Sequence, residues 1–317
     1  MGEGQGRVTL WGLEAFLAVA EEGTVTAAAR RLGVSASAIS QQVTALETTY
    51  ATVLLDRSSR PMRLTPAGMM LRPHAQTILN AEAEARAALA MADLSALTTL
   101  RLGVIEDLDA EVTPRLLAGL AASLPNCRFL LETGASHRLL DALEARALDL
   151  VIAADPGGGP GEARVEVHPL LEDPFLAVLP QAAATSEGLP FIAYSARYPM
   201  GRLIAAEMSR ANLHPARRFE MDSYNAILAM VAAGQGWTIL TPLALHHAAR
   251  FAPEVAVQPL PVAPFSRCIQ LTARAGILQD IPAQVAGQAR RLLAETVVLP
   301  AQTAWPWAGI RVLEGGV

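Results

Sequence analysis

The stretch "GTVTAAARRLGVSASAISQQVTALE", residues 23–47, decides the fold of the N-terminal region. It holds two short helical patterns that meet at Gly33, which can end the first helix. Ser35 is a good N-cap for the second helix, which we expect to reach about Thr49. The second helix has too many Ser and Gln residues for a face that is buried in a core. These residues are also uncharged, whereas a solvent-facing helix surface is usually charged. The composition therefore favours a helix that binds another molecule.

Neighbouring segments complete a small domain around these two helices. Apolar residues recur at helical spacing over residues 10–22, which predicts an amphipathic helix that Gly23 can end. Residues 54–65, "LLDRSSRPMRLT", read as strand, turn and strand. Three helices and a β-wing predict a winged helix-turn-helix over residues 10–66. The polar, Gly-rich residues 1–9 are expected to be a disordered lead.

The second helix of such a pair lies in the DNA major groove and reads base edges from its N-terminal half. Gln can hydrogen-bond adenine bidentately, and Ser can reach bases or phosphates. Residues 30–72 hold six Arg residues against two carboxylates, although the whole chain has a net charge of -5. A basic face on an acidic protein is what phosphate contact needs, so the sequence predicts binding to double-stranded DNA.

A long helix is expected to follow the wing. Pro66 suits the first turn of a helix, and the residues up to 95 are rich in Ala, Leu, Met and Glu. The apolar stripe Leu71, Ile78 and Leu89 favours burial against a second copy of the chain over the alternative, a solvated spacer. We therefore expect residues 67–95 to link the domains and to form a homodimer.

The pattern changes after residue 96. "LRLGVI" (100–105), "RFLLET" (128–133) and "LDLVIA" (148–153) are expected to be short buried strands separated by helices, which predicts a parallel sheet with crossover helices. A second α/β lobe is expected over about 173–264, and the chain then returns to the first lobe, about 100–172 and 265–298. The two lobes form one domain, residues 96–298. No role is assigned to the tail, residues 299–317.

Several classes of protein are disfavoured by composition. Cys127 and Cys268 lie far apart in apolar segments and are expected to be free thiols, and no metal-binding spacing occurs. No secretory signal and no run of 18 apolar residues is visible, so a cytoplasmic protein without a membrane span is expected. Because no catalytic motif appears, we expect no enzyme activity and no cofactor.

The pattern "LEAFLAVAEEGTVTAAARRLGVSASAISQQVTALE…LLDRSSRPMRLTPAG" resembles the LysR-type transcriptional regulators. The resemblance continues to about residue 296. It implies an α/β chain with a winged helix-turn-helix, a long linker helix and a two-lobed, periplasmic-binding-protein-like effector domain. Ser40 and Gln42 match the family's recognition helix, and Arg60 matches a wing Arg that enters the minor groove. The candidate DNA-binding residues are Arg31, Ser35, Ala36, Ser37, Ser40, Gln41, Gln42, Arg57, Arg60 and Arg63.

Some positions depart from the family pattern. Ser35-Ala36-Ser37 stands where the family commonly has Ser-Gln-Pro, and Gln41 replaces a frequent Arg. Ala51 and Val53 replace a common Gly and Arg after the recognition helix. These departures make the family's usual operator sequence a poor guide for this chain. The expectation that the chain binds DNA does not change.

The resemblance also implies a small-molecule effector, of unknown identity, between the two lobes. The candidate effector-binding residues are Asp107, Gly134, Ser136, Tyr194, Ser195, Arg197, Met200, Asp222, Ser223 and Thr241. Acidic residues 106, 107 and 109 stand where the family often has a small hydroxyl residue. They suggest an effector with a cationic group near Asp107. The alternative is that these acids only stabilise a helix N-terminus and face solvent.

The expected function is a DNA-binding transcriptional regulator controlled by this effector, with a homodimer or homotetramer as the assembly. RNA polymerase is a further expected partner. Two other functions stay open. A solute-binding protein on the same two-lobed architecture would carry an export signal, and an architectural DNA-binding protein would have a cleft that binds no effector.

Overall fold

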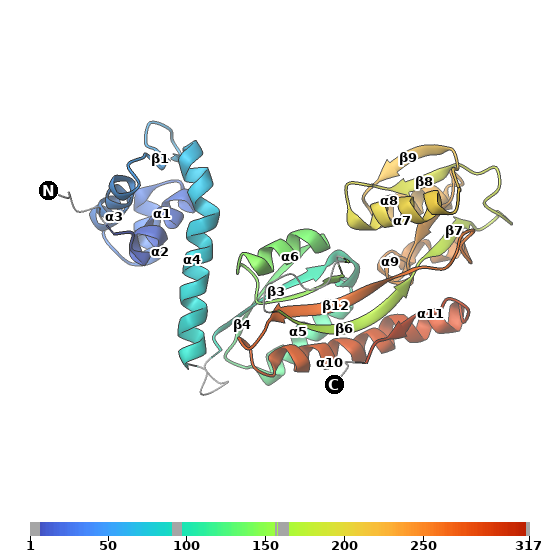
Figure 1. The fold of residues 1–317 in the computed structure, drawn as a ribbon. Coiled ribbons are helices and arrows are strands. Elements are labelled where there is room, and N and C mark those ends of the chain that lie inside the picture. The colour runs from blue at the N-terminus through green and yellow to red at the C-terminus, as the bar shows by residue number, and fades with distance from the viewer. Residues whose placement is uncertain (1–6, 91–96, 156, 158–164, 315–317) are drawn as a thin grey trace. The chain divides into compact units, whose positions relative to one another are not determined.

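A computed structural model describes residues 7–90, 97–155, 157 and 165–314 (Figure 1). The chain forms two compact units, one N-terminal and one that begins at Leu97. Most of the expected lead and the end of the linker segment, residues 91–95, lie outside the described residues. Among the described helices, none has the length and apolarity that a membrane span requires.

Three helices form the body of the N-terminal unit: α1 (Leu10–Glu22), α2 (Val25–Leu32) and α3 (Ala36–Thr49). Their ends follow the local signals in the sequence. Thr24 and Ser35 accept hydrogen bonds from the N–H groups of Ala27 and Ala38, at 3.1 and 3.2 Å. Gly23 and Gly33 end α1 and α2 with φ of 70° and 69°, in the left-handed region that favours glycine. The predicted helix boundaries are therefore confirmed.

The wing and the long helix follow directly. Strand β1 (Leu55–Asp56) pairs antiparallel with β2 (Arg63–Leu64), and α4 runs from Pro66 to Ala90. Gly68, in the first turn of α4, packs against the wing so closely that an added Cβ would lie 2.1 Å from the Leu54 carbonyl oxygen. Only glycine allows α4 to start this close to β1.

The first lobe of the second unit is built on a six-stranded mixed sheet with the order β13-β6-β12-β5-β3-β4. Its first three strands in the chain, β3 (Thr99–Ile105), β4 (Arg128–Gly134) and β5 (Leu150–Ala154), are parallel, with β3 in the middle. Helices α5 (Val112–Ser123), α6 (Ser136–Glu144) and α10 (Ile281–Leu293) cover it (Figure 1). The predicted parallel pairing with crossover helices is confirmed for these three strands.

Strand β4 corrects one expectation, because it is exposed and not buried. It lies at the edge of the sheet, and β3 is its only partner among the described strands. Leu130 and Leu131 stay 39% and 42% exposed. A run of apolar residues does not distinguish an edge strand from a central one, because that difference depends on which strands lie beside it.

The second lobe contains β7 (Leu176–Pro180), β8 (Phe191–Tyr194), β9 (Arg217–Met221), β10 (Thr238–Leu240) and β11 (Val255–Gln258). A bridge between Phe191 and Trp237 joins its two small sheets, β8-β9 and β10-β7-β11. Its helices are α7 (Pro199–Arg210), α8 (Tyr224–Ala232), α9 (Pro242–His247) and the 3-10 segment η3 (Ala249–Glu254). One apolar cluster includes residues of α8 and α9, and another includes residues of α7.

Two long antiparallel strands, β6 (Val165–Pro174) and β12 (Ser266–Arg274), connect the lobes (Figure 1). The C-terminal segment then continues α10 through a π-helical turn (Ala294–Val298) into α11 (Leu299–Ala304). The final strand β13 (Arg311–Val312) pairs with β6, and Ile310 before it is 1% exposed. Part of the tail to which the sequence assigned no role is therefore a structural part of the first lobe.

Candidate functional site

Helix α3 presents a polar face because its apolar residues are used by the core. Ile39, Val43 and Leu46 are at most 3% exposed and fix the helix against α1 and α2. The candidate DNA-binding residues of α3 occupy the remaining surface. Ser35, Ala36, Ser37 and Gln41 are exposed, whereas Ser40 and Gln42 are half-buried. The Ser35 hydroxyl caps the helix and lies 3.0 Å from the hydroxyl of Ser37.

The four candidate Arg residues fall into two classes. Arg31 pairs with Glu21 and Glu22, and Glu21 raises the pKa of its guanidinium. Arg57 pairs with Glu47 at 2.8 Å, and Glu47 also accepts N–H bonds from the start of the wing. No carboxylate among the described residues pairs with Arg60 or Arg63, which are both exposed. These two wing residues are the ones whose charge is available to phosphate.

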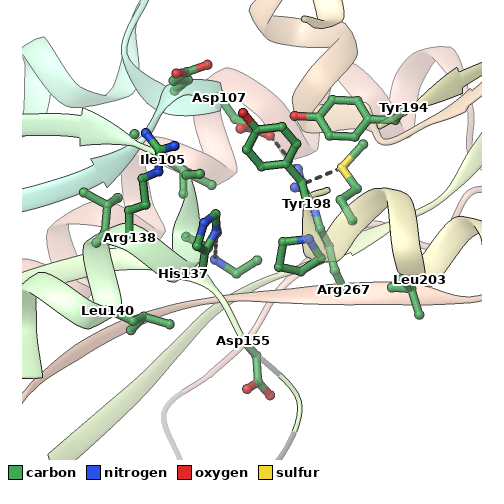
Figure 2. A pocket seen from close by; sticks show the side chains of 18 of the residues that line it. Ile105, Asp107, His137, Arg138, Leu140, Asp155, Tyr194, Tyr198, Leu203 and Arg267 are labelled. Atoms are coloured by element: carbon green, nitrogen blue, oxygen red, sulfur yellow. Dashed lines mark hydrogen bonds and ion pairs between the residues drawn. The ribbon is translucent and has the colours of Figure 1, made fainter. Parts of the chain in front are cut away.

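A cavity of about 720 Å³ lies between the two lobes of the second unit (Figure 2). In Figure 2 His137 and Arg138 at the start of α6 stand on one side, and Tyr194, Tyr198 and Leu203 stand on the other. The volume falls in the range of small-molecule sites. Six candidate effector-binding residues line it, namely Asp107, Gly134, Ser136, Tyr194, Met200 and Asp222.

Four candidates lie outside the lining, and three of them use their hydroxyls within the fold. Ser195 is 1% exposed and donates to a carboxylate oxygen of Glu220 at 2.6 Å. Ser223 caps α8, and the buried Thr241 caps α9. Arg197 is exposed, and its Nε lies 3.5 Å from the Ser195 hydroxyl. A hydroxyl before a helix predicts a cap more reliably than a ligand contact.

Helix α7 carries cavity residues to their positions because its first turn approaches strand β8 closely. A Cβ added to Gly201 would lie 2.2 Å from the Ser195 carbonyl oxygen. The start of α7 therefore packs on the backbone that leaves β8, which places Tyr198 and Met200 in the lining. On the other side, Ser136 at the start of α6 accepts a hydrogen bond from the Ala154 N–H at 3.1 Å.

A buried ionic cluster lies at the cavity wall around Arg267 of β12, a residue that the sequence analysis did not single out. Its guanidinium lies 2.6 Å from Asp107 and 2.9 Å from Asp173, and it donates to the Thr241 hydroxyl at 3.1 Å. The Arg267 side chain is 9% exposed. Burial raises the pKa of Asp173, and Arg267 opposes that shift. The two carboxylates raise the pKa of Arg267 well above its ordinary value, against the effect of burial.

The position of Asp107 corrects one interpretation of the acidic segment at η2 (Glu106–Leu108). Asp107 is 5% exposed, so it does not face solvent, and η2 has no side-chain cap. Glu106 and Asp109 are exposed, as that interpretation expected. Asp107 also lies 3.4 Å from the hydroxyl of Tyr224. A cationic partner for Asp107 is thus already present in the protein, as Arg267.

Aromatic rings form the part of the cavity wall next to this cluster. Tyr194 stacks on Tyr224 with ring centroids 5.3 Å apart, and its ring lies 6.0 Å from that of Tyr198. His137 faces Tyr198 across the cavity at 6.1 Å. Burial raises the pKa of Tyr194 to about 12, and the negative charge of Asp107 adds to that shift.

Two neighbouring histidines of α9 face acidic residues that follow β3. His246 lies 3.4 Å from Glu111, and His247 lies 3.4 Å from Asp109. Both side chains, 24% and 17% exposed, lie between α9 and the segment that precedes α5.

Sequence reasoning missed four residues of the cavity, His137, Tyr198, Tyr224 and Arg267, and it also missed Asp173, the buried partner of Arg267. Tyr198 and Tyr224 offered a weak signal, since each lies within two residues of a candidate. An Arg next to a run of apolar strand residues was the signal for Arg267. Its partners Asp107 and Asp173 are 160 and 94 residues away in the chain, so only the fold brings them together.

Two family models match this chain. The first, described as "Bacterial regulatory helix-turn-helix protein, lysR family", matches residues 10–69. The second, described as "LysR substrate binding domain", matches residues 95–308. Together they cover both units.

A protein of Mycobacterium xenopi described as "Probable hydrogen peroxide-inducible genes activator" is 40% identical over 172 residues, which are 54% of this chain and 89% of that protein. The matches to Mycobacterium avium and Mycobacterium leprae proteins of the same description span 54% of each relative, about half of its length.

Solved structures show the same fold over nearly the whole chain. Full-length OxyR of Pseudomonas aeruginosa is 24% identical, with a TM-score of 0.67 and coverage of 92% of this chain and 97% of that one. A cysteine mutant of Corynebacterium glutamicum OxyR, described as H2O2-bound, is 25% identical, with a TM-score of 0.56 and coverage of 94% and 98%.

Proposed function

The chain belongs to the LysR family of transcriptional regulators, and from that premise we propose that a small molecule in the cavity between its lobes controls how it holds DNA. Family membership makes the protein a DNA-binding regulator with an effector-binding domain. The observation that carries the proposal is that the cavity is lined by both lobes and by the strand that connects them.

The contacts around Arg267 support a coupling between ligand and lobe position. Arg267 belongs to a connecting strand and contacts Asp107 of the first lobe, and it also contacts Thr241 and Met200 of the second. Tyr224 of the second lobe reaches Asp107 of the first. A ligand here touches groups whose spacing changes if the lobes move, so it binds the two arrangements with different affinity. That difference is the requirement for control by a ligand.

On the DNA side, we propose that α3 reads the major groove and that the wing reaches phosphates through Arg60 and Arg63. Pairing of two α4 helices would give a homodimer, and two dimers a homotetramer, with RNA polymerase as a further partner. The exposure of Met69, Met70 and Ile78 on α4 supports this pairing, at 58%, 74% and 41%. The expectation for Leu71 is wrong, because its side chain packs against the core of its own N-terminal unit. The side chain of Leu89, also from the expected stripe, lies outside the described residues.

The proposal is tested by blocking the cavity. Full-length protein is screened by thermal unfolding against amines, amino acids, aromatic acids and sugar acids. A ligand at 100 times its dissociation constant should stabilise the protein by about 2.7 kcal/mol. Leu140→Trp fills space at the cavity wall and should abolish the shift without changing DNA affinity.

Leu299→Trp is the matched control, because Leu299 is 58% exposed and lies outside the lining. It should keep the ligand shift of the wild-type protein. A shift that survives in Leu140→Trp would place the ligand elsewhere and contradict the proposal.

A response to peroxide is the second candidate function, because three relatives are described as peroxide-inducible activators and Cys268 lines the cavity. Burial raises the pKa of the Cys268 thiol, and the carboxylates of Asp155 and Glu172 add to that shift. Less thiolate at neutral pH means slower oxidation. The thiol chemistry therefore favours a bound ligand over peroxide.

We expect Cys268 to be alkylated by iodoacetamide more slowly than free cysteine at pH 7.5. Its rate should rise to the free-cysteine value only at a pH above the ordinary thiol pKa. We also expect peroxide treatment to leave the DNA affinity unchanged, both in the wild-type protein and in Cys268→Ala. A peroxide-dependent change in wild-type DNA affinity that disappears in Cys268→Ala would favour the second candidate function.

A further inference from the structure

The distribution of tyrosine in this chain is uneven. The sequence contains four tyrosines, and three of them, Tyr194, Tyr198 and Tyr224, line the cavity between the lobes. The ring of Tyr194 is in contact distance of both others. Aromatic faces carry partial negative charge and attract cations, most strongly where water is excluded.

The charged side chains of the lining are mostly acidic. Among the residues that the structure describes, five carboxylates line the cavity (Glu106, Asp107, Glu132, Asp155 and Asp222), against two guanidinium groups, Arg138 and Arg267. Arg267 pairs with both Asp107 and the fully buried Asp173, and burial raises the pKa of Asp173. When both carboxylates are ionised, the cluster holds one negative charge more than Arg267 balances, and a cation in the cavity would offset that charge.

Two of the carboxylates touch the tyrosines. Asp107 lies 3.4 Å from the Tyr224 hydroxyl, and Asp222 lies 3.5 Å from the Tyr198 hydroxyl. Burial raises the pKa of Tyr194 to about 12, and the carboxylate of Asp107 adds to that shift. Carboxylates and aromatic faces are therefore gathered in one part of the cavity.

The rest of the lining suits an apolar group. Ile105, Leu140, Phe175 and Leu203 line the cavity, and Figure 2 shows Leu140 and Leu203 on opposite sides of it. A ligand that fills about 720 Å³ thus meets charged and aromatic groups at one part and aliphatic groups elsewhere.

We propose that the effector is an organic ammonium ion with an apolar body, whose cationic group lies against the rings of Tyr194 and Tyr198 and between the carboxylates of Asp107 and Asp222. This inference rests on the proposed function and names the ligand class of the same cavity. It differs from a cation bound by Asp107 alone, because Arg267 already pairs with that carboxylate.

One feature of the cavity favours the opposite charge. The N–H groups at the start of α6, together with Arg138, would suit an anion. Arg138 is exposed, as are four of the five carboxylates, whereas Asp107 is 5% exposed and pairs with Arg267. We expect the negative groups to dominate because they outnumber the positive groups in the described lining, and the test includes an anion to decide between them.

The test uses three ligands of matched size and different charge on the full-length protein, with binding measured by calorimetry. They are 2-phenylethylammonium, uncharged 2-phenylethanol and anionic phenylacetate. The ammonium ion should bind at least about tenfold more tightly than the alcohol, since a desolvated cation–π contact corresponds to roughly that factor. Phenylacetate should bind more weakly than the alcohol.

Two pairs of variants locate the contact. Asp222→Asn should weaken binding of the ammonium ion about tenfold and leave the alcohol unchanged. Asp141→Asn, the same change at an exposed residue of α6 outside the lining, should leave both unchanged. Tyr198→Phe keeps the aromatic face and should retain binding, whereas Tyr198→Leu removes the face and should lose it.

Tighter binding of phenylacetate than of the ammonium ion would overturn the inference while the cavity remains a ligand site. Failure of the ammonium ion to bind, or equal binding to Tyr198→Leu and wild type, would also overturn it. The proposed function fails separately, if every ligand shift in the wider panel survives in Leu140→Trp.

Discussion

Replacement of Arg267 by Met should lower the free energy of unfolding of the effector-binding unit by about 3–5 kcal/mol. The change leaves two carboxylates without their cation, at Asp107 and Asp173, which are 5% and 0% exposed. Removing one partner of a buried ion pair is far more destabilising than removing a surface pair, because the remaining charge cannot recover its hydration. The measurement is chemical denaturation of the full-length variant, followed by intrinsic fluorescence, since three of the four tryptophans (237, 305 and 307) belong to this unit.

Arg311→Met is the matched control. Arg311 also pairs with a carboxylate, Glu172, but its side chain is 67% exposed. This variant should lose less than about 1 kcal/mol. Equal losses in the two variants would mean that the cluster around Arg267 is not the buried ionic centre described above.

The double variant Arg60→Ala/Arg63→Ala should lower the salt dependence of DNA binding by about two units of slope and weaken binding about 30-fold at 0.15 M salt. Each Arg that contacts phosphate releases close to one counterion, so the slope counts the lost contacts. Both residues are exposed, and no described carboxylate competes for them. The measurement is a titration of a duplex with the full-length protein at several salt concentrations.

Arg210→Ala is the control for the DNA titration, because Arg210 is 72% exposed and lies in the other unit. It should leave the slope unchanged. Arg57→Ala should change the slope less than Arg60→Ala, since Arg57 is partly neutralised by Glu47. An unchanged slope in the double variant would remove the wing from the phosphate contacts.

The N-terminal unit was predictable because its signals are local. Thr24 and Ser35 each cap the helix that follows by accepting a hydrogen bond from the N–H group three residues ahead. Gly23 and Gly33 end helices through their own backbone conformation. Such features depend on neighbours in the chain, which the sequence displays directly. The helix-turn-helix and its polar face followed from them.

The cavity was only partly predictable because its contacts are distant in the chain. Ser195 and Thr241 resembled ligand-binding hydroxyls. In the structure Ser195 donates a hydrogen bond to Glu220, and Thr241 caps α9. Arg267 meets Asp107 across 160 residues, and no local pattern encodes that contact. The exposure of β4 and the pairing of β13 with β6 likewise depend on sheet order.

Coupling between the cavity and DNA is the central claim, and it is reciprocal: if a ligand changes DNA affinity, DNA changes ligand affinity by the same factor. The most direct measurement is the dissociation constant of 2-phenylethylammonium for the full-length protein, with and without a duplex selected in vitro by the protein itself. We predict that the two constants differ by at least about fivefold. Equal constants with and without the duplex would contradict control of DNA binding through the cavity.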